Sequence, residues 1–340
     1  MDNSTSQTSA PPLLEVRNLT KHFPVSVGLF RRQVGVIKAV DDVSFDVHAG
    51  ETLGLVGESG SGKTTAGRLI LRLLEPTNGK MIFHQDGQEV DLLGLQREPL
   101  RRFRRHMQLI FQDPFASLNP RMMVSTIISE PLRAQGVPSR EIEKRVRQLT
   151  DEVKLNYDYL KRYPHAFSGG QRQRIGIARA LALHPKLVIC DEPVSALDVS
   201  VQAQIINLLK DLQQEHGLAY LFIAHDLSVV ENLSHRVAVM YAGRIVEMAE
   251  TNLLFRQPRH PYTKALMEAV PDPVPRGKAQ RNLLEGEVAD PSDLPSGCSF
   301  HPRCRFCEQR CREQTPELRD LGGNQLVACH LAEDIASAGN

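Results

Sequence analysis

The sequence has almost no net charge, because 41 lysine and arginine residues face 40 aspartate and glutamate residues and leave a balance of +1. Proteins that nucleic acid attracts electrostatically usually carry a strong positive field. The composition therefore argues against a nucleic-acid partner. Repeats of solenoid period are also missing. A hydrophobic fraction of 41% and a charged fraction of 24% nevertheless fit a folded chain.

Long apolar runs are missing as well. No stretch approaches the roughly 18 apolar residues that a membrane-spanning helix needs. The first residues lack the basic segment and apolar segment of a secretory signal, so we expect a cytoplasmic location. Five of the six cysteines lie from Cys298 onward. In a reducing compartment, such a cluster indicates metal binding rather than disulfides.

A length of 340 residues predicts about two domains. Up to residue 255 the pattern is α/β, with short apolar strands between amphipathic helices. Residues 114–185 carry helical periodicity with few strand signals, and residues 236–250 are typical of a closing hairpin. Beyond them the chain becomes rich in proline and then in cysteine. We expect an α/β domain over residues 13–255 and a small Cys-rich domain over residues 256–340.

A glycine-rich segment between an apolar strand and a helix matches the phosphate-binding P-loop pattern. Its glycines let backbone N–H groups approach phosphate oxygens, and the helix that follows adds a favourable dipole. Lys63 should reach the β- and γ-phosphates, and the Thr64 hydroxyl should ligate Mg²⁺. The strand before and the helix after the segment argue against a chance glycine-rich turn. The predicted nucleotide-binding residues are Gly57, Glu58, Ser59, Gly60, Ser61, Gly62, Lys63, Thr64 and Thr65.

Two acidic residues, Asp191 and Glu192, follow the apolar segment LVIC. A buried parallel strand would deliver them to the sheet edge where the P-loop lies. Asp191 can hold Mg²⁺, directly or through water, and Glu192 can accept a proton from an attacking water. Acidic pairs at strand ends are common, so the prediction depends on the P-loop in the same chain.

A second anion site is predicted at the segment FSGGQ. Ser168, the N–H groups of Gly169 and Gly170, and a helix that starts near Gln171 can together bind a phosphate. A nucleotide on the P-loop already has its own phosphate site. The second site should therefore serve a nucleotide bound to another chain, which predicts a head-to-tail dimer with ATP at the interface.

The motifs GESGSGKTT, FSGGQRQR, LVICDEPVSALD and IAHD resemble those of the ATP-binding cassette superfamily in order and spacing. The resemblance covers about residues 13–255. It implies a P-loop NTPase fold with a RecA-like core, an antiparallel β subdomain and a helical subdomain over about residues 114–185 that carries the Ser-Gly-Gly-Gln motif.

The same resemblance implies roles for four further residues. Gln112 in LIFQDP would sense the γ-phosphate, join the Mg²⁺ site and meet the membrane partner. His225 would hold the γ-phosphate and the attacking water, and Asp198 would contact the opposite subunit. Phe23 matches the position of the aromatic residue that stacks on adenine. Without the shared motif order, each of the four would be an ordinary core or surface residue.

The tail resembles the C-terminal extension of oligopeptide and dipeptide importer ATPases, through HPYTKALMEAVP, GCSFHPRC and VACHL. This implies ATP hydrolysis that drives peptide import, with relatives that carry glutathione or nickel instead. The implied partners are two transmembrane permease subunits, a second, paralogous ATPase subunit and an extracytoplasmic solute-binding protein. The implied location is the cytoplasmic face of the bacterial inner membrane, where the chain would be peripheral.

The cysteines allow two interpretations. The spacing of Cys304 and Cys307 is that of a C-x-x-C pair, which could hold Zn²⁺ with other thiolates. The family pattern instead implies a [4Fe–4S] cluster and leaves Cys307 as an extra thiol. Four thiolates suit either metal. The cluster ligands implied by the family pattern are Cys298, Cys304, Cys311 and Cys329.

Two other classes of function fit the sequence less well. A soluble cassette ATPase that acts on nucleic acid or ribosomes usually has two cassettes or a long coiled-coil insertion, and this chain has one P-loop and no sustained heptads. A regulatory, non-catalytic cassette would lack Glu192 or His225, and both are present.

Overall fold

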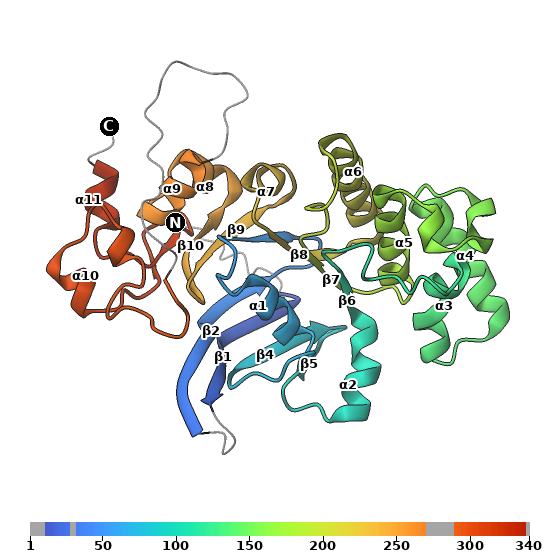
Figure 1. Ribbon diagram of the computed structural model, residues 1–340, viewed down its shortest axis with the longest axis horizontal. Helices are drawn as coiled ribbons and strands as arrows, with labels where there is room; N and C mark the ends of the chain where they lie inside the picture. Colours follow the sequence, from blue (N-terminus) through green and yellow to red (C-terminus); the bar gives the residue numbers. More distant parts are fainter. Residues whose placement is uncertain (1–10, 28–31, 270–288, 338–340) are drawn as a thin grey trace, which may run out of the picture.

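The computed structural model describes residues 11–27, 32–269 and 289–337. Two sheets form the centre of the molecule, with an all-helical region at one end and the C-terminal extension at the other (Figure 1). The sheets have the strand orders β2-β1-β4-β5 and β11-β12-β10-β9-β3-β8-β7-β6. The α/β fold class predicted from the sequence is confirmed.

The smaller sheet is antiparallel throughout. Its strands are β1 (Leu14–Val27), β2 (Arg32–Val47), β4 (Asn78–Gln85) and β5 (Gln88–Asp91). Strand β2 is long, with 16 residues. Its first half pairs with β1, for example at Lys38 with His22, and such long-range pairing leaves little trace in a local pattern.

The larger sheet has a parallel centre, in which β3 pairs with β8 and β9, and β7 pairs with β6 and β8. Strands β3, β7 and β8 are buried along their whole length, as expected for strands covered on both faces. Cys190 is core here. The strands are β3 (Thr52–Val56), β6 (Met107–Ile110), β7 (Leu187–Asp191), β8 (Ala219–Ala224), β9 (Arg236–Tyr241) and β10 (Arg244–Glu250).

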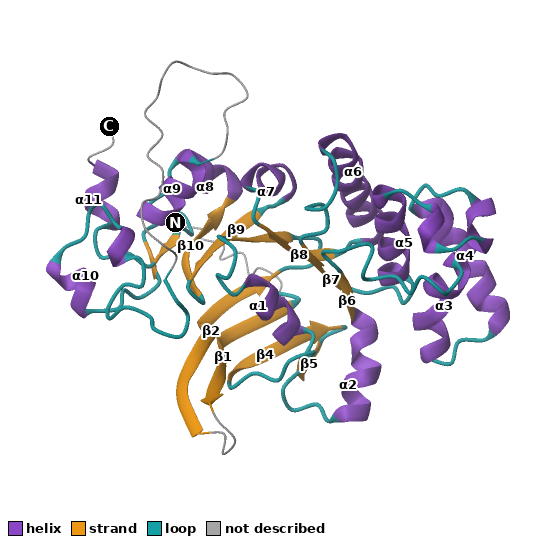
Figure 2. Cartoon of the chain, viewed as in Figure 1, coloured by secondary structure: helices purple, strands orange, loops and turns teal. Residues whose placement is uncertain are grey.

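Helices cover both faces of this sheet (Figure 2). Helix α1 packs between the two sheets, where a Cβ at Gly67 would lie 2.9 Å from the end of the Ile223 side chain and 3.2 Å from that of Ile189, so a larger residue would displace these side chains. The helices around the sheets are α1 (Lys63–Ile70), α2 (Arg97–Phe103), α6 (Val199–His216), α7 (Leu227–Leu233), α8 (Thr251–Arg256) and α9 (Pro261–Glu268).

Residues 114–185 are helical with no strand, as the sequence predicts. Their helices are α3 (Val124–Ala134), α4 (Ser139–Glu152) and α5 (Gly169–Leu181), with two short 3₁₀ helices between α4 and α5. Apolar residues such as Ile128, Leu149 and Ile175 are fully buried between them. The region shares one apolar core with the larger sheet.

The C-terminal extension continues the larger sheet. Strand β12 pairs with β10 through Val327 and Glu247, and β11 pairs with β12. Phe300 is buried in the main core. The prediction of a separate Cys-rich domain is therefore not supported, although residues 270–288 of the expected extension lie outside the described residues. Its elements are α10 (Gln309–Glu313), β11 (Arg319–Asp320), β12 (Leu326–Val327) and α11 (Ala332–Ser337).

Within the described ranges, no helix has both the length and the apolar character needed to cross a membrane.

Candidate functional site

The P-loop joins the end of β3 to the start of α1, as predicted. Gly57 and Gly62 have φ angles of 154° and 103°, which side chains rarely tolerate. A Cβ at Gly57 would lie 2.1 Å from the carbonyl oxygen of Met240, and a Cβ at Gly62 would lie 2.1 Å from that of Ala39. Glycine is thus required at both positions, because a side chain there would clash with the neighbouring backbone.

The Lys63 side chain is buried within this loop. Its ammonium donates hydrogen bonds of 2.8 Å to the carbonyl oxygens of Gly57 and Glu58 and one of 3.3 Å to Ser61 Oγ. Burial lowers the pKa of Lys63, while the nearby carboxylates of Glu192, Asp191 and Glu58 raise it. The loop therefore holds a cation at its centre that can exchange carbonyl oxygens for phosphate oxygens.

Thr64, on the first turn of α1, contacts the end of β7. Its hydroxyl donates a 2.8 Å hydrogen bond to Asp191 Oδ1. Burial raises the pKa of Asp191, and the bond from Thr64 and the charge of Arg68 lower it. A hydroxyl oxygen beside a carboxylate is a suitable donor pair for Mg²⁺. Thr65 follows on the same turn and is half-buried.

Glu192 brings together the two other catalytic residues predicted from the sequence. The amide Nε2 of Gln112 donates to Glu192 Oε2 at 2.9 Å, and Nδ1 of His225 lies 3.1 Å from the same oxygen. A hollow of about 50 Å³ lies beside Glu192 and His225, and this volume can hold a water molecule. A carboxylate next to such a hollow can act as a general base.

The backbone of Glu192 lies in the left-handed region, with φ of 45°. Its N–H donates to the carbonyl oxygen of Ile223, and its own carbonyl oxygen accepts from the N–H of Ser195. A non-glycine residue in this region costs on the order of 1–3 kcal/mol and persists only where neighbours hold it. These bonds hold the turn that directs the carboxylate away from the strand.

The Ser-Gly-Gly-Gln motif lies at the N-terminus of α5. Ser168 caps the helix by accepting from the N–H of Gln171, whose side-chain oxygen accepts from the N–H of Ser168. A Cβ on Gly170 would lie 2.4 Å from Val201, near the start of α6. Asp198 caps α6, accepting from the N–H of Val201.

Ser168, Gly169, Gly170, Gln171 and Asp198 thus form a second cluster. In Figure 1, α5 lies across the large sheet from α1, so the cluster is apart from the P-loop of the same chain.

Phe23 lies on β1, half-buried, with the Lys21 ammonium 5.0 Å from the centre of its ring. Its predicted adenine contact stays a prediction.

The cysteine residues of the predicted cluster influence one another. Burial, and to a smaller extent the nearby thiols of Cys298, Cys304 and Cys311, raise the pKa of Cys329 to about 12. Burial also raises the pKa of Cys304, with smaller contributions from the thiols of Cys311 and Cys307. The donor set is chemically suitable for a metal, yet no group of three or more His, Cys, Asp or Glu among the described residues is arranged to hold an ion. The prediction of a [4Fe–4S] cluster or zinc site is therefore not supported by this geometry.

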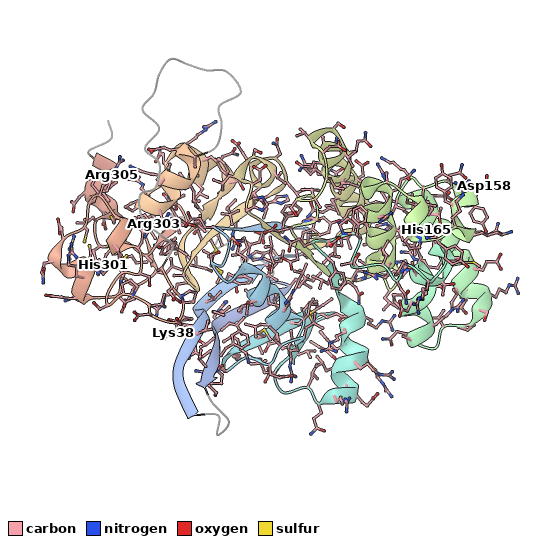
Figure 3. All side chains as sticks on the ribbon, viewed as in Figure 1. Lys38, Asp158, His165, His301, Arg303 and Arg305 are labelled. Atoms are coloured by element: carbon pink, nitrogen blue, oxygen red, sulfur yellow. The ribbon has the colours of Figure 1, made fainter. Side chains whose placement is uncertain are left out.

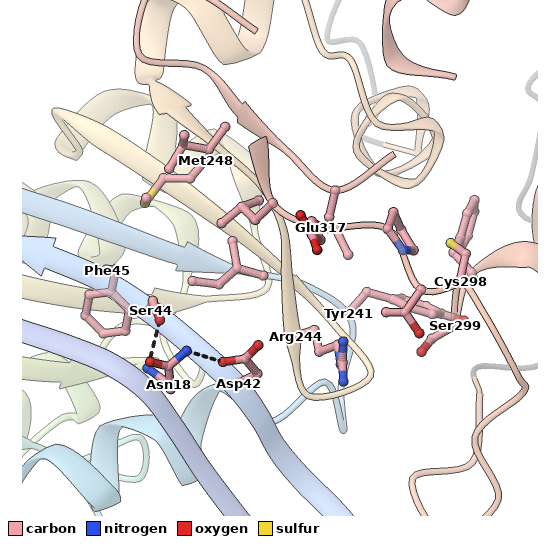
Figure 4. A pocket seen from close by; sticks show the side chains of 18 of the residues that line it. Asn18, Asp42, Ser44, Phe45, Tyr241, Arg244, Met248, Cys298, Ser299 and Glu317 are labelled. Atoms are coloured by element: carbon pink, nitrogen blue, oxygen red, sulfur yellow. Dashed lines mark hydrogen bonds between the residues drawn. The ribbon is translucent and has the colours of Figure 1, made fainter. Parts of the chain in front are cut away.

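A cavity of about 640 Å³ lies between the antiparallel sheet and the C-terminal extension (Figure 4). Its wall includes Asn18, Asp42, Arg244 and Glu317, and Asn18 donates to Asp42. Cys298 is the only predicted site residue on this wall. The cavity is therefore separate from the P-loop, none of whose residues lines it.

Sequence analysis assigned no role to two residues that contact the P-loop. The hydroxyl of Tyr262 accepts from the N–H of Glu58, and Arg303 donates to both carboxylate oxygens of Glu58. The segments HPYT and HPRC, which contain them, carried the resemblance of the tail, but their spacing gives no sign of a contact across some 200 residues.

Two protein families match the sequence. Residues 40–195 match the family described as ABC transporter, and residues 246–311 match the family described as oligopeptide/dipeptide transporter, C-terminal region.

Curated relatives match over nearly the whole chain. A probable peptide ABC transporter ATP-binding protein, y4tS of Sinorhizobium fredii, is 51% identical over 96% of this chain and 92% of its own length. The oligopeptide transport ATP-binding protein AppF of Bacillus subtilis is 52% identical over 94% of this chain and 97% of its own.

Among solved structures, the chain resembles the ATP-binding cassette MJ0796, a dimer bound to ADP and Pi. The TM-score is 0.61 with 28% identity, covering 70% of this chain and 98% of the other.

Proposed function

This chain belongs to the ATP-binding cassette transporter ATPases, and we propose that it is the ATP-hydrolysing subunit of a peptide importer. Relatives about 50% identical over most of the chain are named as peptide or oligopeptide transport proteins. The match to the oligopeptide/dipeptide C-terminal region supports the same substrate class. In this proposal residues 13–255 bind and hydrolyse ATP, residues 114–185 form the helical subdomain, and residues 256–340 form the extension.

The observation that carries the proposal is the pair of contacts on Glu192. Gln112 and His225 hold one carboxylate oxygen beside a hollow that fits a water molecule. We assign Glu192 as the base that takes a proton from this water as it attacks the γ-phosphate. Gln112 and His225 orient the carboxylate and the water, and Lys63 offsets the negative charge of the phosphates.

Thr64, Asp191 and Gln112 are the residues that would hold Mg²⁺. The ion neutralises charge on the β- and γ-phosphate oxygens when it is bound. The P-loop residues Gly57 to Thr65 would cradle the phosphates, and Phe23 would cover the adenine.

The separation of the two anion-binding clusters supports a shared site. Ser168, Gly169, Gly170, Gln171 and Asp198 would complete the nucleotide site of a second cassette, which we propose to be a paralogous ATPase subunit. The dimeric state of the related cassette MJ0796 supports this arrangement. Two transmembrane permease subunits and an extracytoplasmic solute-binding protein would complete the transporter, with this chain peripheral on the cytoplasmic face of the inner membrane.

The proximity of the tail thiols to one another supports a metal-binding role for the extension. We propose Cys298, Cys304, Cys311 and Cys329 as ligands of a [4Fe–4S] cluster, with zinc as the alternative. The donor set fits either metal. Because β12 is part of the cassette sheet, the metal would stabilise the extension rather than take part in hydrolysis.

The test is co-expression with the neighbouring permease and cassette genes, followed by reconstitution into vesicles. Short peptides should stimulate ATP hydrolysis and accumulate inside the vesicles, and Lys63→Ala should abolish both. The matched control is Lys144→Ala on exposed α4. Stimulation by glutathione or nickel but not by peptides would leave the ATPase assignment and replace the substrate.

A further inference from the structure

The segment of the P-loop around Glu58 is rich in glycine. Gly57, Gly60 and Gly62 all have positive φ angles, and glycine loses more conformational entropy on ordering than any other residue. Glu58 follows the first of these glycines. Its carbonyl oxygen accepts from Lys63 Nζ at 2.8 Å and from the N–H of Ser61 at 3.2 Å. The position of Glu58 therefore helps to determine the shape of the loop and the position of its lysine.

The C-terminal extension holds Glu58 by its backbone. The hydroxyl of Tyr262 accepts from the Glu58 N–H at 2.8 Å. Tyr262 lies on α9, is fully buried and packs its ring on Tyr241 at 4.7 Å and Phe300 at 5.4 Å. An aromatic ring fixed on two others has little freedom, so its hydroxyl is a rigid anchor.

The extension also holds Glu58 by its side chain. Arg303 donates from its two terminal nitrogens to the two carboxylate oxygens of Glu58, at 2.7 and 3.1 Å. The Arg303 side chain is only 5% exposed and that of Glu58 is 25% exposed. A bidentate pair between arginine and a carboxylate fixes orientation as well as distance. Figure 3 labels Arg303 on the extension, together with His301 and Arg305.

We propose that Tyr262 and Arg303 are positioning residues that hold Glu58, and through it the P-loop, in the shape that receives the nucleotide phosphates. This inference rests on the proposed ATPase function. A loop that is already ordered loses little further conformational entropy when the nucleotide binds. Glu192, Gln112 and His225 do not contact the pair, so the proton-transfer residues stay in place when it is broken.

The pair should therefore affect nucleotide affinity more than turnover. The P-loop binds the phosphates already in the ground state, and loss of ground-state binding raises KM more than it lowers kcat. We expect Arg303→Gln and Tyr262→Phe each to raise the ATP KM and the Kd of a fluorescent ATP analogue by about tenfold, with kcat within about twofold of wild type.

Matched variants separate positioning from general packing. Arg305→Gln changes an exposed arginine on the same turn, next to the same cysteine. Tyr220→Phe removes a buried hydroxyl that donates to Leu209 on α6. Both should keep the wild-type KM. Arg303→Lys keeps the charge but not the bidentate contact, so it should lose less affinity than Arg303→Gln.

The experiment uses the assembled transporter for KM and kcat and the full chain for nucleotide binding. Glu58→Gln combined with Arg303→Gln should cost no more affinity than either change alone, because both remove one interaction. Wild-type KM and Kd in Arg303→Gln and Tyr262→Phe would overturn the inference, as would equal losses in the two controls or additive losses in the double variant. A wild-type transporter without ATPase activity would instead contradict the proposed function.

Discussion

The hydroxyl of Thr64 and the carboxylate of Asp191, 127 residues apart in the sequence, are joined by a 2.8 Å hydrogen bond. The first residues of α1 and the last residue of β7 meet because β3 and β7 run parallel in one sheet, each next to β8. Parallel strands bring their carboxyl ends to the same edge. This pair defines where a divalent cation and a phosphate chain would meet.

Asp191→Asn should weaken the dependence of hydrolysis on Mg²⁺. An amide keeps the hydrogen bond to Thr64 but removes the negative charge that attracts the ion. We expect the Mg²⁺ concentration for half-maximal ATPase activity to rise at least about tenfold. Asp211→Asn, an exposed aspartate paired with Lys154, is the control. An unchanged Mg²⁺ titration in Asp191→Asn would remove Asp191 from the metal site.

Glu192→Gln should bind ATP and hydrolyse it at least about a hundredfold more slowly than wild type, as expected for loss of a positioned base. The amide retains the shape of the side chain, so nucleotide affinity should stay near normal. The measurement is single-turnover hydrolysis in the assembled transporter, with Glu215→Gln on exposed α6 as control. Near-normal turnover would mean that another group accepts the proton.

Ser168→Arg should leave nucleotide binding by this chain intact but lower ATPase activity of the assembled transporter. The added side chain would block the surface that we assign to the nucleotide of the partner cassette. Ser139→Arg, at the exposed start of α4, places the same side chain at a helix start elsewhere. The isolated chain should be a poor ATPase, so rapid hydrolysis by a strict monomer at every concentration contradicts the shared site.

Four of the five tail cysteines should be metal ligands, and the fifth should not. Anaerobic purification should give a brown protein with iron and acid-labile sulfide. Single serine substitutions at Cys298, Cys304, Cys311 or Cys329 should remove the colour, and Cys307→Ser should not. One stoichiometric zinc in a colourless anaerobic preparation would favour the alternative metal. Loss of metal in Cys307→Ser, with Cys298→Ser unaffected, would favour the C-x-x-C pair.

His260 should make the protein less stable in mild acid. It is buried, and burial lowers its pKa to about 3, whereas the unfolded chain has the ordinary value of about 6.5. Between these values the unfolded state binds more protons, so stability falls as the pH falls below about 6.5. The loss should reach about 1.4 kcal/mol at pH 5.5.

Urea unfolding at pH 7.5 and 5.5 measures this loss. His260→Asn removes the titration and keeps a side chain able to cap α9, because His260 Nδ1 now accepts from the N–H of Tyr262. The variant should lose less stability between the two pH values than wild type. His165→Asn, which changes an exposed histidine, should behave as wild type. Burial of Glu247 raises its pKa and acts in the opposite direction in all three proteins.

Local sequence patterns are enough to predict the fold class, the P-loop and the acidic strand end. Glycine spacing, buried apolar runs and caps are local features, and local features are visible in a linear pattern. The resemblance of the motifs to the ATP-binding cassette family then assigned Glu192, Gln112 and His225 to one catalytic site. Residues that follow parallel strands all lie at the same edge of the sheet, so their nearness to the P-loop follows from the strand assignments.

The contacts between the tail and the nucleotide site, in contrast, could be found only from the folded structure. Strand β12 joins the cassette sheet, and Arg303 and Tyr262 reach Glu58 across more than 200 residues. Such contacts depend on strand pairing and on the packing of Tyr241, Tyr262 and Phe300, which leave no periodic trace in the sequence. A motif predicts what a residue can do, whereas its partner is determined by how the chain folds back on itself.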